Sequence, residues 1–161
     1  MSPLSLWQNA LIRVTRRAHK PALLLPLALL LGACSGSPAE NLGLHDGRLA
    51  PCPDSPNCVN SQAGDAEHFI APLPLKGSAQ QTQTLLKQLL ASEPRVRLVE
   101  EAPGYLRAEF SSKLMRFVDD VEFSIGESAV DVRSASRLGY ADFEVNRKRI
   151  EALRQRLAAQ P

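Results

Sequence analysis

Apolar and polar residues alternate with a period of two through three stretches in the second half of the sequence. The stretch 105–111 shows the pattern, because its second, fourth and sixth residues are apolar and its third and fifth are charged. The stretches 119–125 and 129–136 repeat it, and 95–101 is a fourth candidate strand, joined to the first stretch by a Pro–Gly turn. Successive side chains of a strand point to opposite faces, so we expect an antiparallel sheet with one apolar face and one wetted face.

Two segments outside these strands carry apolar residues at helical spacing. In the first, Ser78 followed by Gln81 is the capping-box pattern that begins a helix, and Pro94 closes it. In the second, Asp142 is the expected N-cap of a helix over 143–158. The apolar stripe of that helix would comprise Phe143, Ile150, Leu153 and Leu157. Together the elements predict an α+β fold, a two-layer sandwich in which an antiparallel sheet of four or five strands carries two helices on one face.

Residues 1–33 have the composition of a secretory signal. The basic residues of this segment are Arg13, Arg16, Arg17 and Lys20. The apolar run that follows, 21–31, is shorter than the roughly 20 residues of a spanning helix, so an uncleaved anchor is the weaker interpretation. The run ends in Leu-Gly-Ala-Cys at 31–34, which resembles the lipobox of bacterial lipoproteins. The resemblance implies cleavage before Cys34 and attachment of lipid to its thiol, with an ordinary secretory signal as the alternative.

Removal of this signal would change the charge of the protein. The whole chain has 19 Lys and Arg against 17 Asp and Glu, and four of the cations lie in the signal. The chain from Cys34 onward therefore has 15 cations against 17 anions, a formal net charge of −2. A net acidic chain argues against nucleic-acid binding, which needs a basic surface or a concentrated basic stripe.

The compartment bears on the remaining cysteines. Ser35, rather than Asp, follows Cys34, and by resemblance to enterobacterial lipoproteins this favours the inner leaflet of the outer membrane, with the domain in the periplasm. In an oxidising space the pair Cys52 and Cys58 is more often bridged than free, and three nearby prolines restrict the loop between them. Free thiols and a metal site are the alternatives, although no histidine lies between the two cysteines.

The segment 34–50 is weakly patterned, begins with small and polar residues, and is expected to be a flexible tether. The roughly 128 residues from Cys34 onward suffice for one core, so 51–161 is expected to form a single domain. Within that domain, 68–72 is a candidate fifth strand at the edge of the sheet, ended by prolines.

Two polar segments bracket this domain. They read CPDSPNCVNS at 52–61 and DVRSASRLGYADFEVNR at 131–147. Together they resemble the family known as domain of unknown function 1499, which occurs in bacterial envelopes and plastids, and the likeness extends over roughly 51–157. The resemblance implies membership of that family, and it implies no activity, substrate or cofactor.

The polar residues of the last strand and the last helix are the candidates for a binding site. Ser134 and Ser136 follow two valines on the strand face expected to pack on the helices, and Asn146 interrupts the apolar stripe of the last helix. In one interpretation Asn146 is structural and pins the loop before its helix, since a buried amide without partners costs about 1–3 kcal/mol. In the other, these three residues line a small polar cleft with Arg137 and Arg147, whose guanidinium groups suit a carboxylate or phosphate.

Other polar residues are weaker candidates. Arg133 is expected on the wetted face of the sheet, in a lattice of cross-strand charges. Asp119 and Asp120 are adjacent on a strand and should point to opposite faces. His68 is the remaining candidate base for nucleophilic catalysis, and no Gly-x-Ser-x-Gly elbow accompanies it. No sequence motif for a metal, a phosphate loop or a dinucleotide cofactor is present.

These patterns favour a non-catalytic envelope module, held to the membrane through Cys34, that binds a small anionic ligand or a protein partner. A hydrolase that uses Ser134 or Ser136 with His68 is one alternative, and a structural spacer without a ligand is another. No cofactor, metal or nucleic acid is expected.

Overall fold

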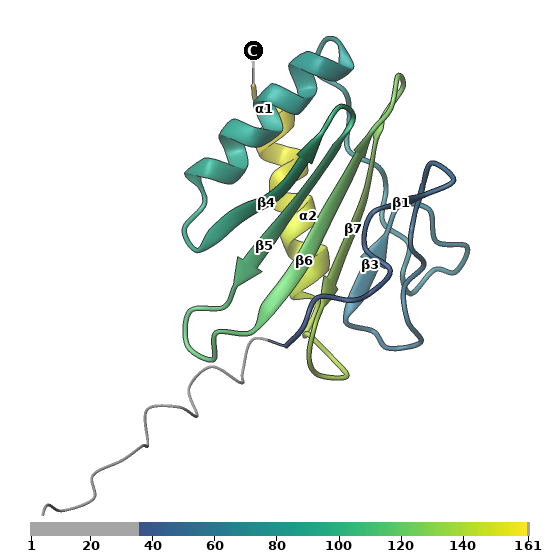
Figure 1. Ribbon diagram of the computed structural model, residues 1–161, viewed down its shortest axis with the longest axis vertical. Helices are drawn as coiled ribbons and strands as arrows, with labels where there is room; N and C mark the ends of the chain where they lie inside the picture. The colour runs from purple at the N-terminus through teal and green to yellow at the C-terminus, as the bar shows by residue number, and fades with distance from the viewer. Residues whose placement is uncertain (1–35, 161) are drawn as a thin grey trace, which may run out of the picture. The chain divides into compact units, whose positions relative to one another are not determined.

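Five antiparallel strands form the main sheet of the computed structural model, which describes residues 36–160 (Figure 1). In spatial order they are β3 (Cys58–Asn60), β7 (Val130–Ser136), β6 (Val118–Ile125), β5 (Tyr105–Ser111) and β4 (Val96–Ala102). The antiparallel pairing confirms the sheet expected from the period-two pattern, and the four strands that this pattern predicted lie within one residue of their expected bounds. The expected signal 1–33 and the expected lipid-attachment site Cys34 lie outside the described residues, and both stay predictions.

The cysteine segment supplies the fifth strand. β3 pairs with β7 along its whole length, whereas 68–72 contributes an isolated bridge between Phe69 and Asn60. The prediction of an edge strand over 68–72 was therefore wrong, because the proline that ends this segment has no N–H with which to extend a ladder. The expected disulfide is confirmed: it joins Cys52 to Cys58 at the start of β3, with the two Cα atoms 5.7 Å apart.

In Figure 1 α2 passes behind the sheet, and α1 lies beside α2 near β4. α1 (Ala79–Ser92) begins with the predicted capping box, in which Ser78 Oγ accepts the Gln81 N–H and Gln81 Oε1 accepts the Ser78 N–H. The buried residues of α1 and α2 (Val145–Ala158) share one apolar core with the inner residues of β5, β6 and β7, which confirms the two-layer α+β sandwich. Within residues 36–160, no helix has both the length and the apolar character needed to cross a membrane.

α2 begins two residues later than expected. Phe143 and Glu144 have left-handed backbone angles, with φ of 55° and 63°, so neither belongs to the helix. Phe143 is therefore 87% exposed, while the rest of the predicted stripe is buried. Asp142 still satisfies the helix end, because its carboxylate accepts the N–H groups of Glu144 at 3.0 Å and Asn146 at 2.7 Å.

Residues 42–50 belong to the fold rather than to the expected flexible tether. A two-stranded hairpin forms here from β1 (Leu44–His45) and β2 (Arg48–Leu49), joined by an Asp–Gly turn. Leu49 and the following Ala50 are buried. The Asp–Gly pair is a local signal for the turn, but nothing local in the sequence shows that the segment packs on the distant sheet.

This hairpin segment covers the sheet face that was expected to be wetted. The Gly43 N–H donates to Glu122 Oε1 at 2.7 Å, and Glu122 has no exposed surface. Asp120 and Arg133, which share this face with Glu122, are 2% and 4% exposed. The charged residues of the sheet thus form a buried network, and the expectation of a solvated charge lattice was wrong at the centre of this face.

Candidate functional site

The predicted polar residues on the helix-facing side form a closed hydrogen-bond network around Asn146, which is 1% exposed. The Asn146 amide oxygen accepts the Ser134 hydroxyl at 2.6 Å, and its nitrogen donates to Ser136 Oγ at 3.0 Å and to the Asn57 carbonyl at 2.9 Å. The Asn57 amide in turn donates to the Gly139 carbonyl at 2.5 Å. The network therefore joins α2, β7, the cysteine segment and the loop before α2, which favours the structural interpretation of Asn146.

Arg149 belongs to the same network and was missed in the sequence. Its Nη1 donates to Asn146 Oδ1 at 2.5 Å and to Ser134 Oγ at 3.0 Å, and its Nη2 pairs with Asp119 Oδ2 at 2.5 Å. The guanidinium carbon also lies 4.7 Å from the centroid of the Phe110 ring. Its position three residues after Asn146, on the same helix face, is the signal that could have identified it.

The structure does not bring Arg137 and Arg147 into this network. Arg137 continues the outward alternation of β7 and lies on the opposite face of the sheet, where its side chain bonds to Asp120. Arg147 donates to the backbone carbonyls of Glu67 and Phe69, both at 2.7 Å, and so fastens the segment before α1 to α2. The five predicted candidates therefore do not line one cleft.

Arg137 is held by two carboxylates on the outer face. Its guanidinium bonds both oxygens of Asp120, at 2.7 and 2.8 Å, and Glu109 Oε1 at 2.6 Å. The hydrogen bonds to Asp120 raise the pKa of Arg137 above its ordinary value. Burial acts to raise the pKa of Glu109, but hydrogen bonds from Arg137 and Arg97 outweigh it and leave that pKa below its usual range. The Nε and Nη2 donors of Arg137 are thus occupied by protein carboxylates.

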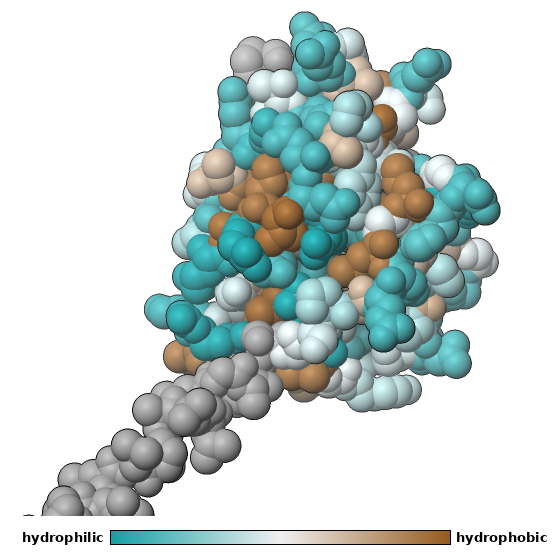
Figure 2. Space-filling view, viewed as in Figure 1, coloured by the Kyte–Doolittle hydropathy of each residue, from teal (hydrophilic) through white to brown (hydrophobic). Residues whose placement is uncertain are grey.

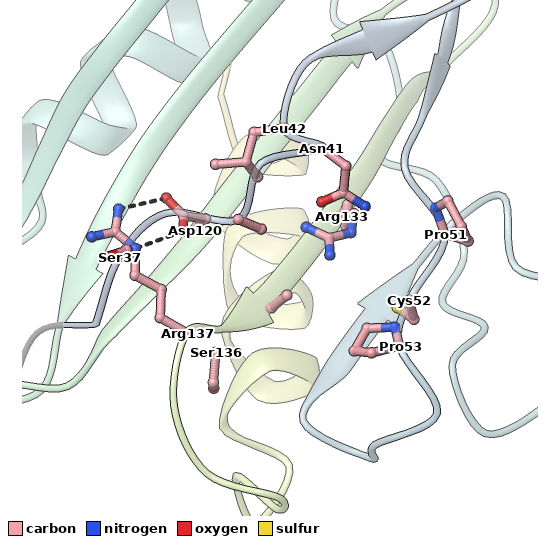
Figure 3. Close-up of a pocket in the computed structure, with 12 residues that line it drawn as sticks. Ser37, Asn41, Leu42, Pro51, Cys52, Pro53, Asp120, Arg133, Ser136 and Arg137 are labelled. Atoms are coloured by element: carbon pink, nitrogen blue, oxygen red, sulfur yellow. Dashed lines mark hydrogen bonds and ion pairs between the residues drawn. The ribbon is translucent and has the colours of Figure 1, made fainter.

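A pocket of about 430 Å³ opens beside this charge network (Figure 3). Its walls come from the N-terminal segment 37–42, from residues 51–53 of the cysteine segment, and from β6 and the end of β7. Three parts of the chain that are far apart in sequence therefore meet here. Arg133, Ser136 and Arg137 contribute to the lining from β7 and the residue after it.

Arg133 is a lining residue with a buried donor that has no hydrogen-bond partner among residues 36–160. Within residues 36–160 it makes one hydrogen bond, from Nη1 to Glu122 Oε2 at 3.2 Å, and its buried Nε has no partner. A guanidinium has five N–H donors, and a buried donor without a partner is uncommon in folded proteins. In Figure 3 the Arg133 side chain lies beside Asn41 of the N-terminal segment.

The acceptors around Arg133 are already well supplied with donors. Glu122 accepts the Gly43 N–H at 2.7 Å and the Tyr105 hydroxyl at 2.9 Å, besides Arg133. Burial, followed by the charge of Glu122, raises the pKa of Tyr105, so its hydroxyl remains a donor. The unused capacity in this part of the site is therefore of the donor kind, which suits an anionic or carbonyl-bearing ligand.

Within residues 36–160, His68 does not bond to either of the serines that the alternative hydrolase mechanism would need. His68 Nδ1 lies 2.9 Å from Asp65 Oδ1, and His68 Nε2 lies 3.3 Å from the Ser55 backbone carbonyl. Among the described residues, no hydrogen bond joins His68 to Ser134 or Ser136, both of which bond to Asn146 instead. The described part of the chain also contains no group of three or more His, Cys, Asp or Glu arranged to hold a metal ion.

A family model described as "Protein of unknown function (DUF1499)" matches residues 48–157. No curated protein and no solved structure gives a significant match to the chain. The matched range contains both polar segments and the sheet residues of the pocket, and it begins after the N-terminal segment 37–42 that forms the pocket's remaining wall.

Proposed function

The chain belongs to the DUF1499 family, whose description assigns no function, and we propose from its own residues that it is a lipid-anchored envelope protein whose outer-face pocket binds a small anionic ligand. The observation that carries the ligand half is the buried Arg133, a residue that lines the pocket and whose Nε has no hydrogen-bond partner among residues 36–160. A protein partner and a structural spacer are the competing functions.

The chemistry of the pocket suits a carboxylate or phosphate group. A guanidinium binds such groups through two parallel N–H donors, and burial strengthens the interaction by removing competing water. The volume of about 430 Å³ lies within the usual range for small-molecule sites. The sequence had suggested two ligand-binding arginines, Arg137 and Arg147. Arg137 is held by two carboxylates and Arg147 by two backbone carbonyls, so Arg133 is the better candidate.

The envelope half of the proposal is supported by the N-terminal sequence and the disulfide. The Leu-Gly-Ala-Cys segment at 31–34 resembles a lipobox, and the Cys52–Cys58 bridge is of a kind that persists in oxidising compartments. Ser35 after the expected lipidated Cys34 favours the outer membrane, with the domain in the periplasm.

Arg133→Met tests the ligand half, because it keeps much of the side-chain length and removes every donor. Millimolar inorganic phosphate or succinate should raise the melting temperature of the wild type and leave that of R133M unchanged, each protein being compared with its own ligand-free sample. A ligand at 100 times its Kd stabilises by about 2.7 kcal/mol, which corresponds to several degrees in a domain of this size.

Arg97→Met is the matched control, since the Arg97 side chain lies on the same sheet but is 72% exposed. R97M should respond to the anions as the wild type does. If neither anion stabilises the wild type, or both stabilise R133M equally, Arg133 serves the fold alone. Crosslinking in the native envelope followed by co-purification would then separate a protein partner from a spacer.

A further inference from the structure

Exposed apolar side chains gather at one end of the domain. Six of the ten large hydrophobic residues that are exposed within residues 36–160 lie on two loops, 112–117 and 137–144, which we call the apolar tip. These six are Leu114, Met115, Phe117, Leu138, Tyr140 and Phe143. Leu114 and Phe143 are 86% and 87% exposed, so neither contributes appreciably to the core. An exposed apolar cluster of this kind marks an interaction surface.

The strand register places the two loops side by side. Loop 112–117 joins β5 to β6, and loop 137–144 joins β7 to α2. Ser111 pairs with Val118 across β5 and β6, and the Arg137 N–H donates to the Val118 carbonyl at 3.1 Å. Both loops therefore leave the sheet at the same end, which is the lower end in Figure 1, and apolar atoms are exposed at that end in Figure 2.

The chain enters the domain at this same end. A Cβ atom placed on Gly36 would lie 2.9 Å from Arg137 Cβ and 3.0 Å from Leu138 Cγ, so the Gly36 backbone lies directly against the apolar tip. Cys34 precedes Gly36 by two residues, and two extended residues span at most about 7 Å. An acyl chain on Cys34 would therefore begin beside the apolar tip.

The charges of the first loop, 112–117, also suit a lipid surface. Lys113 and Arg116 flank Leu114 and Met115 on the first loop, and both basic residues are exposed. Within residues 36–160 neither makes an ion pair, so both remain available to anionic headgroups. Apolar and aromatic side chains interleaved with basic ones are typical of segments that lie in the membrane interface.

We propose that the apolar tip inserts into the bilayer interface, so that loops 112–117 and 137–144 and the lipid on Cys34 together hold the domain against the membrane in one orientation. This inference rests on the proposed lipid anchor. The domain would be docked on the membrane and would not rotate freely on a long tether, because the folded chain already begins at Gly36. The pocket would then open close to the lipid surface, since its residues Ser37 and Arg137 neighbour Gly36.

Single-tryptophan variants of the lipidated protein test the docking. The one tryptophan of the sequence, Trp7, lies in the expected signal, so the processed protein would carry no other. Leu114→Trp and Phe143→Trp place a reporter on each loop, and Glu127→Trp places the control on the exposed β6–β7 turn, at the opposite end of the sheet. Each variant is purified from membranes and reconstituted into vesicles of phosphatidylethanolamine and phosphatidylglycerol, with and without brominated acyl chains.

The L114W and F143W proteins should show blue-shifted emission and lose most of their intensity in brominated vesicles, while E127W should show neither change. If the protein floats with the vesicles but L114W and F143W behave like E127W, the anchor stands and the docking is wrong. A blue shift that increases with protein concentration, without quenching by brominated lipid, would show that the apolar tip contacts a second copy of the chain. The membrane docking would then be wrong. If the protein does not float and Cys34 carries no lipid, the anchor and the docking fail together.

Discussion

Asn146 and Arg137 are both polar residues next to the end of β7, and the structure satisfies them in different ways. Asn146 is held on the helix-facing side by the Ser134 hydroxyl, the Asn57 carbonyl and the Arg149 guanidinium. Arg137 is held by the charged Asp120 and Glu109 on the outer side. In both cases the partners are buried or nearly so, and loss of the central side chain would leave them without compensation.

Alanine substitutions at these two residues should both lower the free energy of unfolding. We expect a loss of about 1–3 kcal/mol for Asn146→Ala, from unsatisfied buried groups. We expect about 3 kcal/mol for Arg137→Ala, because the buried Asp120 then keeps only its longer contact with Arg107, at 3.4 Å. Urea unfolding measures both, with the exposed Arg97→Ala as the control, for which about 0–1 kcal/mol is expected. A near-neutral R137A would contradict the proposed role of Arg137 in holding Asp120 and Glu109.

The lowered pKa of Glu109 predicts a loss of stability in acid. Its pKa in the folded protein lies below the ordinary 4.5, so the contribution is fully present above that value and is lost as pH falls through the folded pKa. Arg137→Ala removes the main hydrogen-bond donor to this carboxylate and should bring its pKa back toward 4.5. The stability difference between the wild type and R137A should therefore shrink as pH is lowered from neutral to below 4.5, measured by urea unfolding. A difference that stays constant with pH would show that Glu109 does not titrate as the geometry implies.

Among the elements, β3 is the shortest strand of the main sheet and depends most on a covalent link. It has three residues, and the disulfide to Cys52 constrains its first residue, Cys58. The Ser136 N–H bonds to the Asn57 carbonyl, one residue before β3, which extends the contact with β7. Because β3 also carries the cysteine segment that lines the pocket, its attachment to the sheet determines the shape of the site.

Loss of the disulfide should therefore loosen β3 before the rest of the sheet. Alkylation of exported protein without reductant should leave Cys52 and Cys58 unlabelled, and the double variant Cys52→Ser/Cys58→Ser should be less stable by about 2 kcal/mol. Hydrogen exchange should accelerate at the amides of β3 and remain slow in β5, which serves as the internal control. Free labelling of both thiols before reduction would show that the bridge does not form in the cell.

At the scale of the whole molecule, the N-terminal segment links the expected anchor to the buried charge network. Residues 37–42 form one wall of the pocket, and Gly43 bonds to the buried Glu122. The segment that follows Cys34 therefore completes the fold and does not serve as a long spacer. Placement of the domain in the cell then depends on whether Cys34 is processed and acylated.

Cys34→Ser should move the protein from the membrane fraction to the soluble periplasmic fraction, because the apolar tip alone is not expected to retain it as a lipid anchor does. Mass spectrometry of the wild-type N-terminus should find an acylated Cys34 as the first residue. Ser35→Asp is the sorting control, and by resemblance to enterobacterial lipoproteins it should hold the protein in the inner membrane. A mature chain that starts elsewhere, or an unmodified Cys34, would rule out the lipoprotein.

Local patterns in the sequence were sufficient to predict most of the secondary structure. The alternation over 105–111 can be recognised locally, because side chains two residues apart share a face of the strand. The structure places β5 at the same bounds. The capping box at Ser78 is equally local, since both of its hydrogen bonds join residues three apart. Alternation also placed Asp119 and Asp120 on opposite faces, where they bond Arg149 and Arg137.

The tertiary structure alone decided what covers each face and which polar residues remain without partners. Alternation put Arg133 on the outer face of the sheet, but it could not show that the unpatterned residues 36–50 fold back over that face and bury its charges. The fifth strand was also expected in the wrong segment, because the three residues of β3 are too few to show a recognisable pattern. The sequence by itself determined the elements, whose periods are set by contacts within a few residues. The pocket and its unpartnered guanidinium arise from contacts between segments about 80 to 100 residues apart, which no local period encodes.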